Sequence, residues 1–333
     1  MNGGEVFATG PIETKADRGW ATAAFYGGLL VALAVLPLFF GSPYMMHILI
    51  LCLIYIIAGE SLRTVTISGQ FPMAHAAFMG IGAYVAGLLS KWLGWHVWIT
   101  IPAASLASTA IGVLIGFPFA RLRALYYAMG SLFFGIGVMN IITAFGHYTG
   151  GYAGLMGIPP IFIGAKQPYY YLLLALTLLS TLALYRFEFS RIGINLKAIA
   201  QSHLVASSVG INEGFYRVFV LGFGSFFAGL AGACYAHYNM VISPTSFNFM
   251  ATLWLMMYVL VGGIDSFAGP IVGTLILFLI PEIFRDLKYY SPYLSAAILL
   301  IIVYVMPKGI VSLPSLIENR HRAQKNKKAS GVV

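Results

Sequence analysis

The chain has 333 residues, of which 59% are hydrophobic and only 9% are charged. A water-soluble domain of this size could not bury so much apolar surface, so the composition excludes a soluble protein. The formal net charge of +9 does not indicate a partner nucleic acid, because basic loops and tails of an apolar chain set its membrane topology and contact anionic membrane lipid.

Apolar segments of about 20 residues, the length that crosses a bilayer as a helix, recur from Ala21 to Met306. They are continuously apolar rather than alternating, which disfavours a β-barrel. The sequence therefore predicts an all-α polytopic membrane protein with about ten transmembrane helices. Because the eighth and tenth segments are short, between about nine and eleven crossings fit the pattern.

The chain divides into a polar N-terminal segment (1–20), a transmembrane domain (21–306) and a basic tail (307–333). The N-terminal segment is not followed by a short apolar core with a small-residue cleavage site, so we expect no removable signal peptide. The expected spans are 21–40, 45–62, 73–89, 96–119, 124–145, 169–187, 216–237, 247–261, 267–284 and 293–306.

The basic residues predict the orientation of these spans. If the N-terminus is cytoplasmic, fifteen of the 19 Lys and Arg residues fall on the cytoplasmic side. Only Lys91, Lys166, Arg285 and Lys288 fall outside. We therefore expect both termini and the polar loop 188–215 to be cytoplasmic, and the loops 150–166 and 239–246 to lie on the opposite side.

The polar loop carries the pattern of a short amphipathic helix. Asn195 is a plausible N-cap, apolar residues recur from Leu196 to Val209, and Gly210 stands where a left-handed C-terminal cap is expected. The sequence predicts one helix lying between the sixth and seventh spans.

The chain lacks the motifs of an enzyme. It has no nucleotide-binding Gly-x-x-x-x-Gly-Lys-Ser/Thr loop and no metal-ligand spacing, so we expect no cofactor and no metal. Cys52 and Cys234 lie inside spans and indicate no disulfide. Glu60 and Glu282 lie near span ends, where an interfacial role, with Arg63 or Arg285 nearby, is favoured over a role in a pathway.

The third span combines small and polar residues. Its small residues would let neighbouring helices approach closely, and Pro72 indicates a broken start with free backbone donors. Gln70 and His75 stand at this start. A hydrogen-bonded packing role for His75 is weighted above contact with a substrate, because buried polar groups need partners whatever their function.

Five motifs in order resemble one known family. They are HAAFMGIGAY (75–84), GLMGIPP (154–160), VASSVGIN (205–212), AGLAGACYAHY (228–238) and GGIDSFAGPIVG (262–273). Together, over about residues 50–309, they are similar to the permease of branched-chain amino acid ABC importers, and most to the second permease of the pair, the M subunit.

The resemblance implies a subunit of the bacterial inner membrane that works with three kinds of partner protein. It would pair with a sister permease, dock two cytoplasmic ATPase subunits that bind the ATP, and receive substrate from a periplasmic binding protein. It also implies that the central helix is an ATPase-coupling helix, in which His203, Ser207 and Ser208 replace the acidic residues common in the family. The expected coupling residues are Leu196, Ile199, Gln201, His203, Leu204, Val205, Ala206, Val209 and Gly210.

The expected pathway is apolar and aromatic, which suits Leu, Ile or Val. Its candidate residues are Gln70, His75, Phe78, Tyr84, Phe133 and Phe134. The alternatives are the same importer class carrying an amide, urea or a small aromatic or organic acid, and, from another class, a stand-alone channel or ion-coupled carrier. A membrane enzyme ranks below both.

Overall fold

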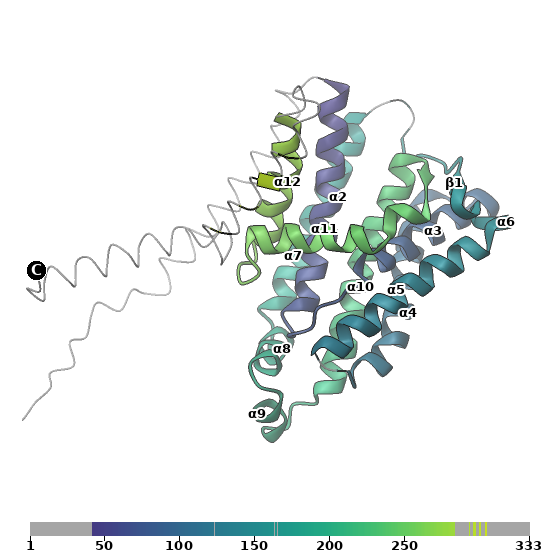
Figure 1. The fold of residues 1–333 in the computed structure, drawn as a ribbon. Helices are drawn as coiled ribbons and strands as arrows, with labels where there is room; N and C mark the ends of the chain where they lie inside the picture. Colours follow the sequence, from purple (N-terminus) through teal and green to yellow (C-terminus); the bar gives the residue numbers. More distant parts are fainter. Residues whose placement is uncertain are drawn as a thin grey trace, which may run out of the picture.

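The structure is a computed structural model that describes residues 42–122, 124–162, 164 and 166–283, with the single positions 293, 296, 297, 300 and 304. The expected first span, most of the expected tenth span, the polar N-terminal segment and the basic tail lie outside the described residues. The described part is built almost entirely of helices, as the composition predicts (Figure 1).

Each expected span from the second to the ninth corresponds to a helix. The elements in chain order are α2 (Pro43–Thr66), α3 (His75–Trp92), α4 (Val97–Phe119), α5 (Ala124–Ala144), α6 (Gly146–Thr149), η1 (Gly151–Ala153), β1 (Leu155–Met156), α7 (Lys166–Glu188), α8 (Arg191–Gln201), α9 (His203–Ser208), α10 (Glu213–Asn239), β2 (Val241–Ile242), η2 (Pro244–Phe247), α11 (Phe249–Gly262) and α12 (Gly269–Ile283).

Six helical segments of the described part are long and apolar enough to cross a membrane. They are α2, α4, α5, α7, α10 and the continuous stretch Pro244–Gly262 formed by η2 and α11. α12 is apolar but shorter, and α11 crosses α2 in Figure 1 whereas α12 runs alongside it. The fold is therefore an all-α polytopic one.

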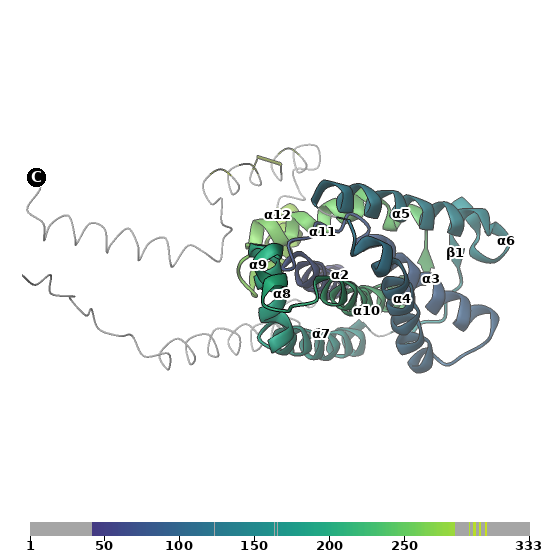
Figure 2. The same cartoon turned by 90° about the horizontal axis from the view of Figure 1, so that it is seen from below.

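α10 forms the centre of the bundle, between α2, α3 and α4 (Figure 2). Glycines allow α3 and α10 to touch backbone to backbone: a Cβ on Gly82 would lie 2.2 Å from the Gly229 carbonyl oxygen, and one on Gly232 would lie 1.8 Å from that of Met79. Such close contact maximises van der Waals attraction where the bilayer supplies no hydrophobic force between helices. The small residues of the third span thus have the packing role that the sequence predicts.

Burial separates central helices from peripheral ones. In the most apolar 18-residue window of each helix, 78% of the residues of α2 and 67% of those of α10 are buried, against 11% for α5. α2 and α10 are therefore core helices, and α5 presents most of its surface to the bilayer or to another protein.

The two ends of the bundle differ. At one end β1 pairs antiparallel with β2, with Leu155 opposite Ile242 and Met156 opposite Val241. At the other end lie α8 and α9 (Figure 1). The loops 150–166 and 239–246 therefore share one side and the α8–α9 segment occupies the opposite one, which agrees with the relative sidedness predicted from basic residues.

Candidate functional site

The polar loop forms two helices, so the prediction of one helix over Leu196–Val209 is wrong. α8 begins earlier, because the Ser190 hydroxyl accepts the backbone N–H of Gly193 as an N-cap. The chain breaks at Ser202, which adopts an extended conformation (φ −159°, ψ 108°) and caps α9 by accepting the N–H of Val205. A serine hydroxyl that bonds the backbone ahead of it competes with helix continuation, and this explains the break.

Two further local expectations had different outcomes. Asn195 is not an N-cap: it lies within α8, and its side-chain amide donates to the Tyr216 hydroxyl at 2.7 Å. Gly210 does adopt the left-handed conformation predicted for it, with φ +83°.

α8 is anchored to the bundle. Leu196 and Ile199 are 0% and 3% exposed, and Leu196 packs with Phe187 of α7 and Val220 of α10. The turn from α7 into α8 needs a glycine, since a Cβ at Gly193 would lie 2.1 Å from the Glu188 carbonyl oxygen. Leu196 and Ile199, two of the predicted coupling residues, therefore fix the segment in place.

α9 presents an apolar patch to its surroundings. Leu204, Val205 and Val209 are 69%, 64% and 71% exposed, whereas Ala206 between them is buried. We call Leu204, Val205 and Val209 the α9 patch. Exposed apolar side chains on a short helix that is held by a buried neighbour are typical of a surface that a partner covers. Gln201 and Gly210 are also exposed, and His203 is half-buried beside the patch.

A buried ion cluster joins this segment to the spans. The Glu188 carboxylate, at the end of α7, accepts two hydrogen bonds from the Arg63 guanidinium of α2, the longer being 3.1 Å from Nη2 to Oε1. Lys197 of α8 donates to the same Oε1 at 2.8 Å. The side chains of Arg63 and Glu188 are only 2% and 3% exposed. One carboxylate thus links α2, α7 and α8.

Arg63 also holds the connection between α11 and α12. Its Nε donates to the carbonyl oxygen of Ile264 at 2.8 Å, and its guanidinium lies 5.7 Å from the ring centroid of Phe267. The sequence placed Arg63 near Glu60 on its own helix, whereas the structure pairs it with Glu188. The two residues are 125 positions apart, and the only signal in the sequence is an acidic residue at the entrance to a basic loop.

Glu60 lies deeper in the bundle than a span end. α2 continues to Thr66, and the side chain of Glu60 is 2% exposed. Its Oε2 accepts a hydrogen bond of 2.7 Å from the hydroxyl of Thr181 on α7, while its Oε1 is buried and has no hydrogen-bond partner in the described part of the chain. Glu60 is therefore buried between α2 and α7 and does not lie at the end of its helix, while its interfacial role stays a prediction. The side chains of Glu282 and Arg285 lie outside the described residues.

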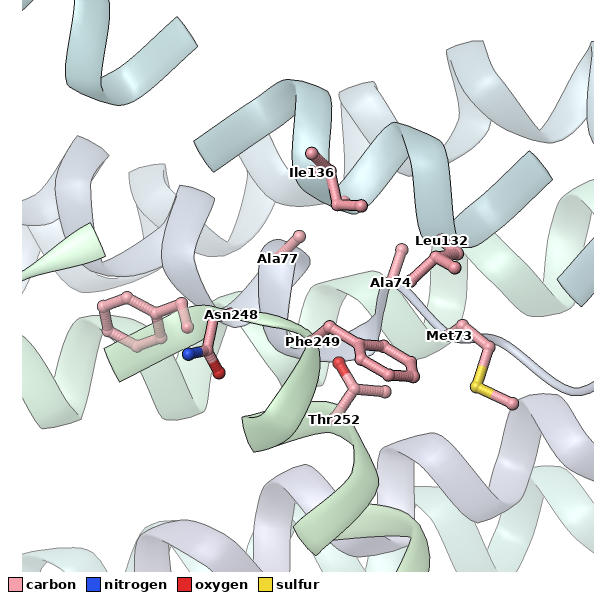
Figure 3. A pocket seen from close by; sticks show the side chains of 10 residues that line it. Met73, Ala74, Ala77, Leu132, Ile136, Asn248, Phe249 and Thr252 are labelled. Atoms are coloured by element: carbon pink, nitrogen blue, oxygen red, sulfur yellow. The ribbon is translucent and has the colours of Figure 1, made fainter. Parts of the chain in front are cut away.

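The start of α3 is broken, but its backbone donors are not free. The N–H of Met73 donates to the Ser131 hydroxyl of α5 at 3.0 Å, and the N–H of Ala76 donates to the Thr252 hydroxyl of α11 at 3.1 Å. A cavity of about 10 Å³, room for one water molecule, lies at this junction of α3, α5 and α11 (Figure 3). Side chains of other helices thus satisfy the backbone that the broken start exposes.

His75 and Gln70 are buried at this start. His75 is 0% exposed and its Nε2 lies 2.7 Å from the Ser61 hydroxyl of α2. Gln70 is 3% exposed, and its amide nitrogen has no hydrogen-bond partner among the described residues. The arrangement of His75 is that of a hydrogen-bonded packing residue, which the sequence analysis weighted above substrate contact.

The aromatic candidates for the pathway divide into two groups. Tyr84 and Phe134 line an apolar cavity of about 490 Å³ between α3, α4 and α5, and Phe78 packs on Phe134 with ring centroids 5.4 Å apart. Phe133, also on α5, is 65% exposed and does not line this cavity. The structure therefore brings Phe78, Tyr84 and Phe134 together, and places Phe133, His75 and Gln70 elsewhere.

Comparison with known proteins agrees with this architecture. Residues 44–307 match the family described as branched-chain amino acid transport system / permease component. The chain belongs to this family of permeases. The permease is 28% identical over 316 residues to the high-affinity branched-chain amino acid transport system permease protein LivM of Escherichia coli K12, an alignment that covers 85% of this chain and 74% of LivM. LivM of Salmonella typhimurium is equally similar, at 28% over 313 residues.

The permease also resembles a second type of subunit. It is 34% identical over 145 residues to the permease protein LivH of Escherichia coli K12, covering 42% of this chain and 46% of LivH. No solved structure matches the chain significantly. The longer LivM alignment confirms that the permease is LivM-like, as the motifs predict.

The family assignment settles the class of activity. The chain is a multi-pass membrane permease component and not an enzyme. Within the described residues no group of three or more His, Cys, Asp or Glu side chains is placed to hold a metal ion.

Proposed function

We propose that this permease forms, with a sister permease, the translocation pathway of an ATP-driven importer for branched-chain amino acids in the bacterial inner membrane. Two cytoplasmic ATPase subunits would bind and hydrolyse the ATP, and a periplasmic binding protein would deliver the substrate. The similarity to LivM and LivH, two permease proteins of a high-affinity branched-chain amino acid transport system, supports this choice of substrate and of a paired permease.

The observation that carries the proposal is the α9 patch. Two large apolar side chains on α9 and a third directly after it are more than half exposed, and α9 lies at the end of the bundle where the predicted topology places the cytoplasm. An ATPase groove that covers Leu204, Val205 and Val209 would remove this apolar surface from water. α8, whose buried face holds it against α7 and α10, would carry the movement of the ATPase into both spans.

The apolar cavity between α3, α4 and α5 is our candidate for a part of the pathway. Its volume of about 490 Å³ falls within the range of small-ligand sites, about 300–1,000 Å³. Phe134 and Tyr84 in its wall suit an aliphatic side chain such as that of leucine. This lining suits only the side chain of such a substrate, because the charged ammonium and carboxylate groups of an amino acid would need polar partners outside these walls. The choice of branched-chain substrates over urea or an amide therefore rests on the similarity to LivM and LivH.

Uptake by the reconstituted importer tests the proposal. The permease would be placed in proteoliposomes with its sister permease and ATPases, and with the binding protein added outside. We expect uptake of labelled leucine that requires ATP inside the proteoliposomes and its hydrolysis. Excess amide or urea should not inhibit this uptake. Uptake that continues without ATP while the membrane potential is clamped would contradict the proposal and indicate a stand-alone channel or carrier.

A further inference from the structure

The turn between α3 and α4 exposes large apolar side chains. Three of the five tryptophans of the chain, Trp92, Trp95 and Trp98, lie within seven positions of one another at this turn. They are 53%, 45% and 51% exposed, and their neighbours Leu93 and Ile99 are 58% and 55% exposed. We call these five residues the tryptophan turn. So much apolar surface on a short turn indicates that something other than water covers it.

The tryptophan turn has a fixed shape at the β1–β2 end of the bundle. The backbone N–H groups of Leu93 and Trp95 both donate to the Leu89 carbonyl oxygen, each at 3.2 Å. The indole N–H of Trp92 donates to the carbonyl oxygen of Tyr148 at 3.3 Å, and Tyr148 directly precedes the loop 150–166 that contains β1. The exposed side chains therefore belong to an ordered surface.

This turn begins an exposed apolar stripe that runs the length of α4. Every exposed residue of α4 is apolar, and beyond the turn the stripe continues at spacings of three or four through Pro102, Leu106, Ala110, Leu114 and Phe117. With 23 residues α4 is about 34 Å long, slightly more than the hydrocarbon core of about 30 Å and less than the whole bilayer. If the stripe faces the acyl chains, the ends of α4 therefore reach the headgroup layers.

The chemistry of the tryptophan turn fits such a layer. Tryptophan combines a large apolar ring with one N–H donor, and it is enriched where the hydrocarbon meets the headgroups. The indole N–H groups of Trp95 and Trp98 make no hydrogen bond to the described residues, so they are available to lipid oxygens. Lys91 is exposed at the end of α3, with its Nζ 5.5 Å from the ring centroid of Trp92. A lysine at a helix end extends its charge toward the lipid phosphates.

We propose that the tryptophan turn lies in the phospholipid headgroup layer at the β1–β2 end of the permease. The rings of Trp95 and Trp98 lie below the phosphates, and their N–H groups donate to lipid phosphate or ester oxygens. Trp92 links this layer to Tyr148, which lines the apolar cavity between α3, α4 and α5. The end of the cavity that Tyr148 lines is therefore held close to the headgroups.

Quenching of tryptophan fluorescence measures the depth of the turn. In the full-length permease, Trp20→Phe, Trp92→Phe, Trp95→Phe and Trp254→Phe leave Trp98 as the single fluorophore. The variant is placed in phosphatidylcholine vesicles whose acyl chains carry bromine either near the headgroup or near the methyl end. We expect the shallow bromines to quench Trp98 at least about twofold more strongly, because interfacial indoles lie near the headgroups.

Leu106→Trp in the same background, with Trp98→Phe added, is the matched control. Leu106 is 60% exposed on the same stripe and lies eight residues after Trp98, about 12 Å further along the helix. The deep bromines should quench it more strongly than the shallow ones. The same order of quenching at both positions would overturn the proposal. Stronger quenching of Trp98 by iodide in the water than by either lipid would also overturn it, and would indicate a surface for a water-soluble partner protein.

Charge substitution gives a second measurement that leaves the other tryptophans in place. Leu106→Lys should lower the amount of folded permease in the membrane at least about tenfold, because a charge on the lipid-facing side near mid-membrane is unfavourable. Trp98→Lys should lower it less than about fivefold, since that cost falls close to zero near the headgroups. Equal losses at the two positions would contradict the placement of the tryptophan turn in the headgroup layer.

Discussion

The Glu188 carboxylate forms ion pairs with two cations at the junction where α7 ends and α8 begins. Its position is enforced by a buried Arg63 on one side and a rim-exposed Lys197 on the other. A buried ion pair contributes less to stability than its Coulomb attraction suggests, because both charges lose their hydration. Removal of one partner is costly, however, since the other charge stays buried without compensation.

Glu188→Gln should therefore destabilise the permease strongly. We expect a loss of about 3–5 kcal/mol in the free energy of unfolding, because the Arg63 guanidinium is left buried without its carboxylate. The measurement is unfolding by SDS titration in mixed micelles. The control is Glu213→Gln, which removes an i,i+4 pair with Arg217 whose side chains are 19% and 10% exposed. It should cost less than Glu188→Gln, because this pair is more accessible to water and Arg217 keeps its hydrogen bond to the Leu122 carbonyl oxygen. Equal losses for the two variants would show that burial of the Glu188 pair does not govern its contribution.

At the scale of the helix, local sequence patterns predicted most of what is observed. The spans follow from apolar runs, and the left-handed conformation of Gly210 follows from its place after an amphipathic segment. The break at Ser202 could not be predicted from the sequence. A serine inside a periodic segment can either continue the helix or cap the next one, and the packing of the segment against the bundle determines which occurs. The Arg63–Glu188 pair could not be predicted either, since it depends on how α2 packs against α7 and has no sequence period.

The close contact between α3 and α10 leads to a second testable prediction, which concerns the packing of helices. Gly232→Ala should destabilise the fold by about 1–3 kcal/mol or more, because its Cβ would lie 1.8 Å from the Met79 carbonyl oxygen and the helices must separate. Gly137→Ala in α5 is the matched control: no atom lies within 4 Å of its Cβ, and it should be neutral or stabilise the helix by up to about 1 kcal/mol. Thermal unfolding of the purified variants measures both. A stable Gly232→Ala protein would refute the backbone contact.

The α8–α9 segment leads to a third prediction, because replacing a leucine by aspartate should have different effects at an exposed and at a buried position of this segment. Leu204→Asp, in the exposed patch, should leave folding intact and weaken ATPase binding about ten- to hundredfold, since burial of a leucine contributes about 1.5–3 kcal/mol. Leu196→Asp, at a position that is 0% exposed, should instead prevent stable folding. Copurification of the ATPase and unfolding temperature distinguish them. A Leu204→Asp permease with a full ATPase complement and normal uptake would show that α9 is only a surface loop.

At the scale of the whole molecule, the strand pair and the α8–α9 segment define two opposite ends. The pairing of β1 with β2 requires the loops 150–166 and 239–246 to be on the same side, whatever the orientation of the bundle. Basic residues then predict which side is cytoplasmic, because cytoplasmic loops carry the excess of Lys and Arg. The orientation and the total of about ten spans remain predictions that depend on this charge asymmetry.

Labelling of single cysteines from outside the cell tests the orientation directly. Cys52 and Cys234 are both buried, so replacing both by alanine should give a cysteine-free permease with an unchanged surface. We expect a membrane-impermeant maleimide to label cysteine introduced at Tyr152, which is 80% exposed, and at Thr245 beyond β2. Cysteine at Gln201, at the end of α8, should react only after the membrane is permeabilised. Labelling of Gln201→Cys in intact cells, together with protection of the other two positions, would invert the bundle and place the α9 patch outside the reach of any cytoplasmic ATPase. The same experiment therefore decides whether the α9 patch can dock the ATPase at all.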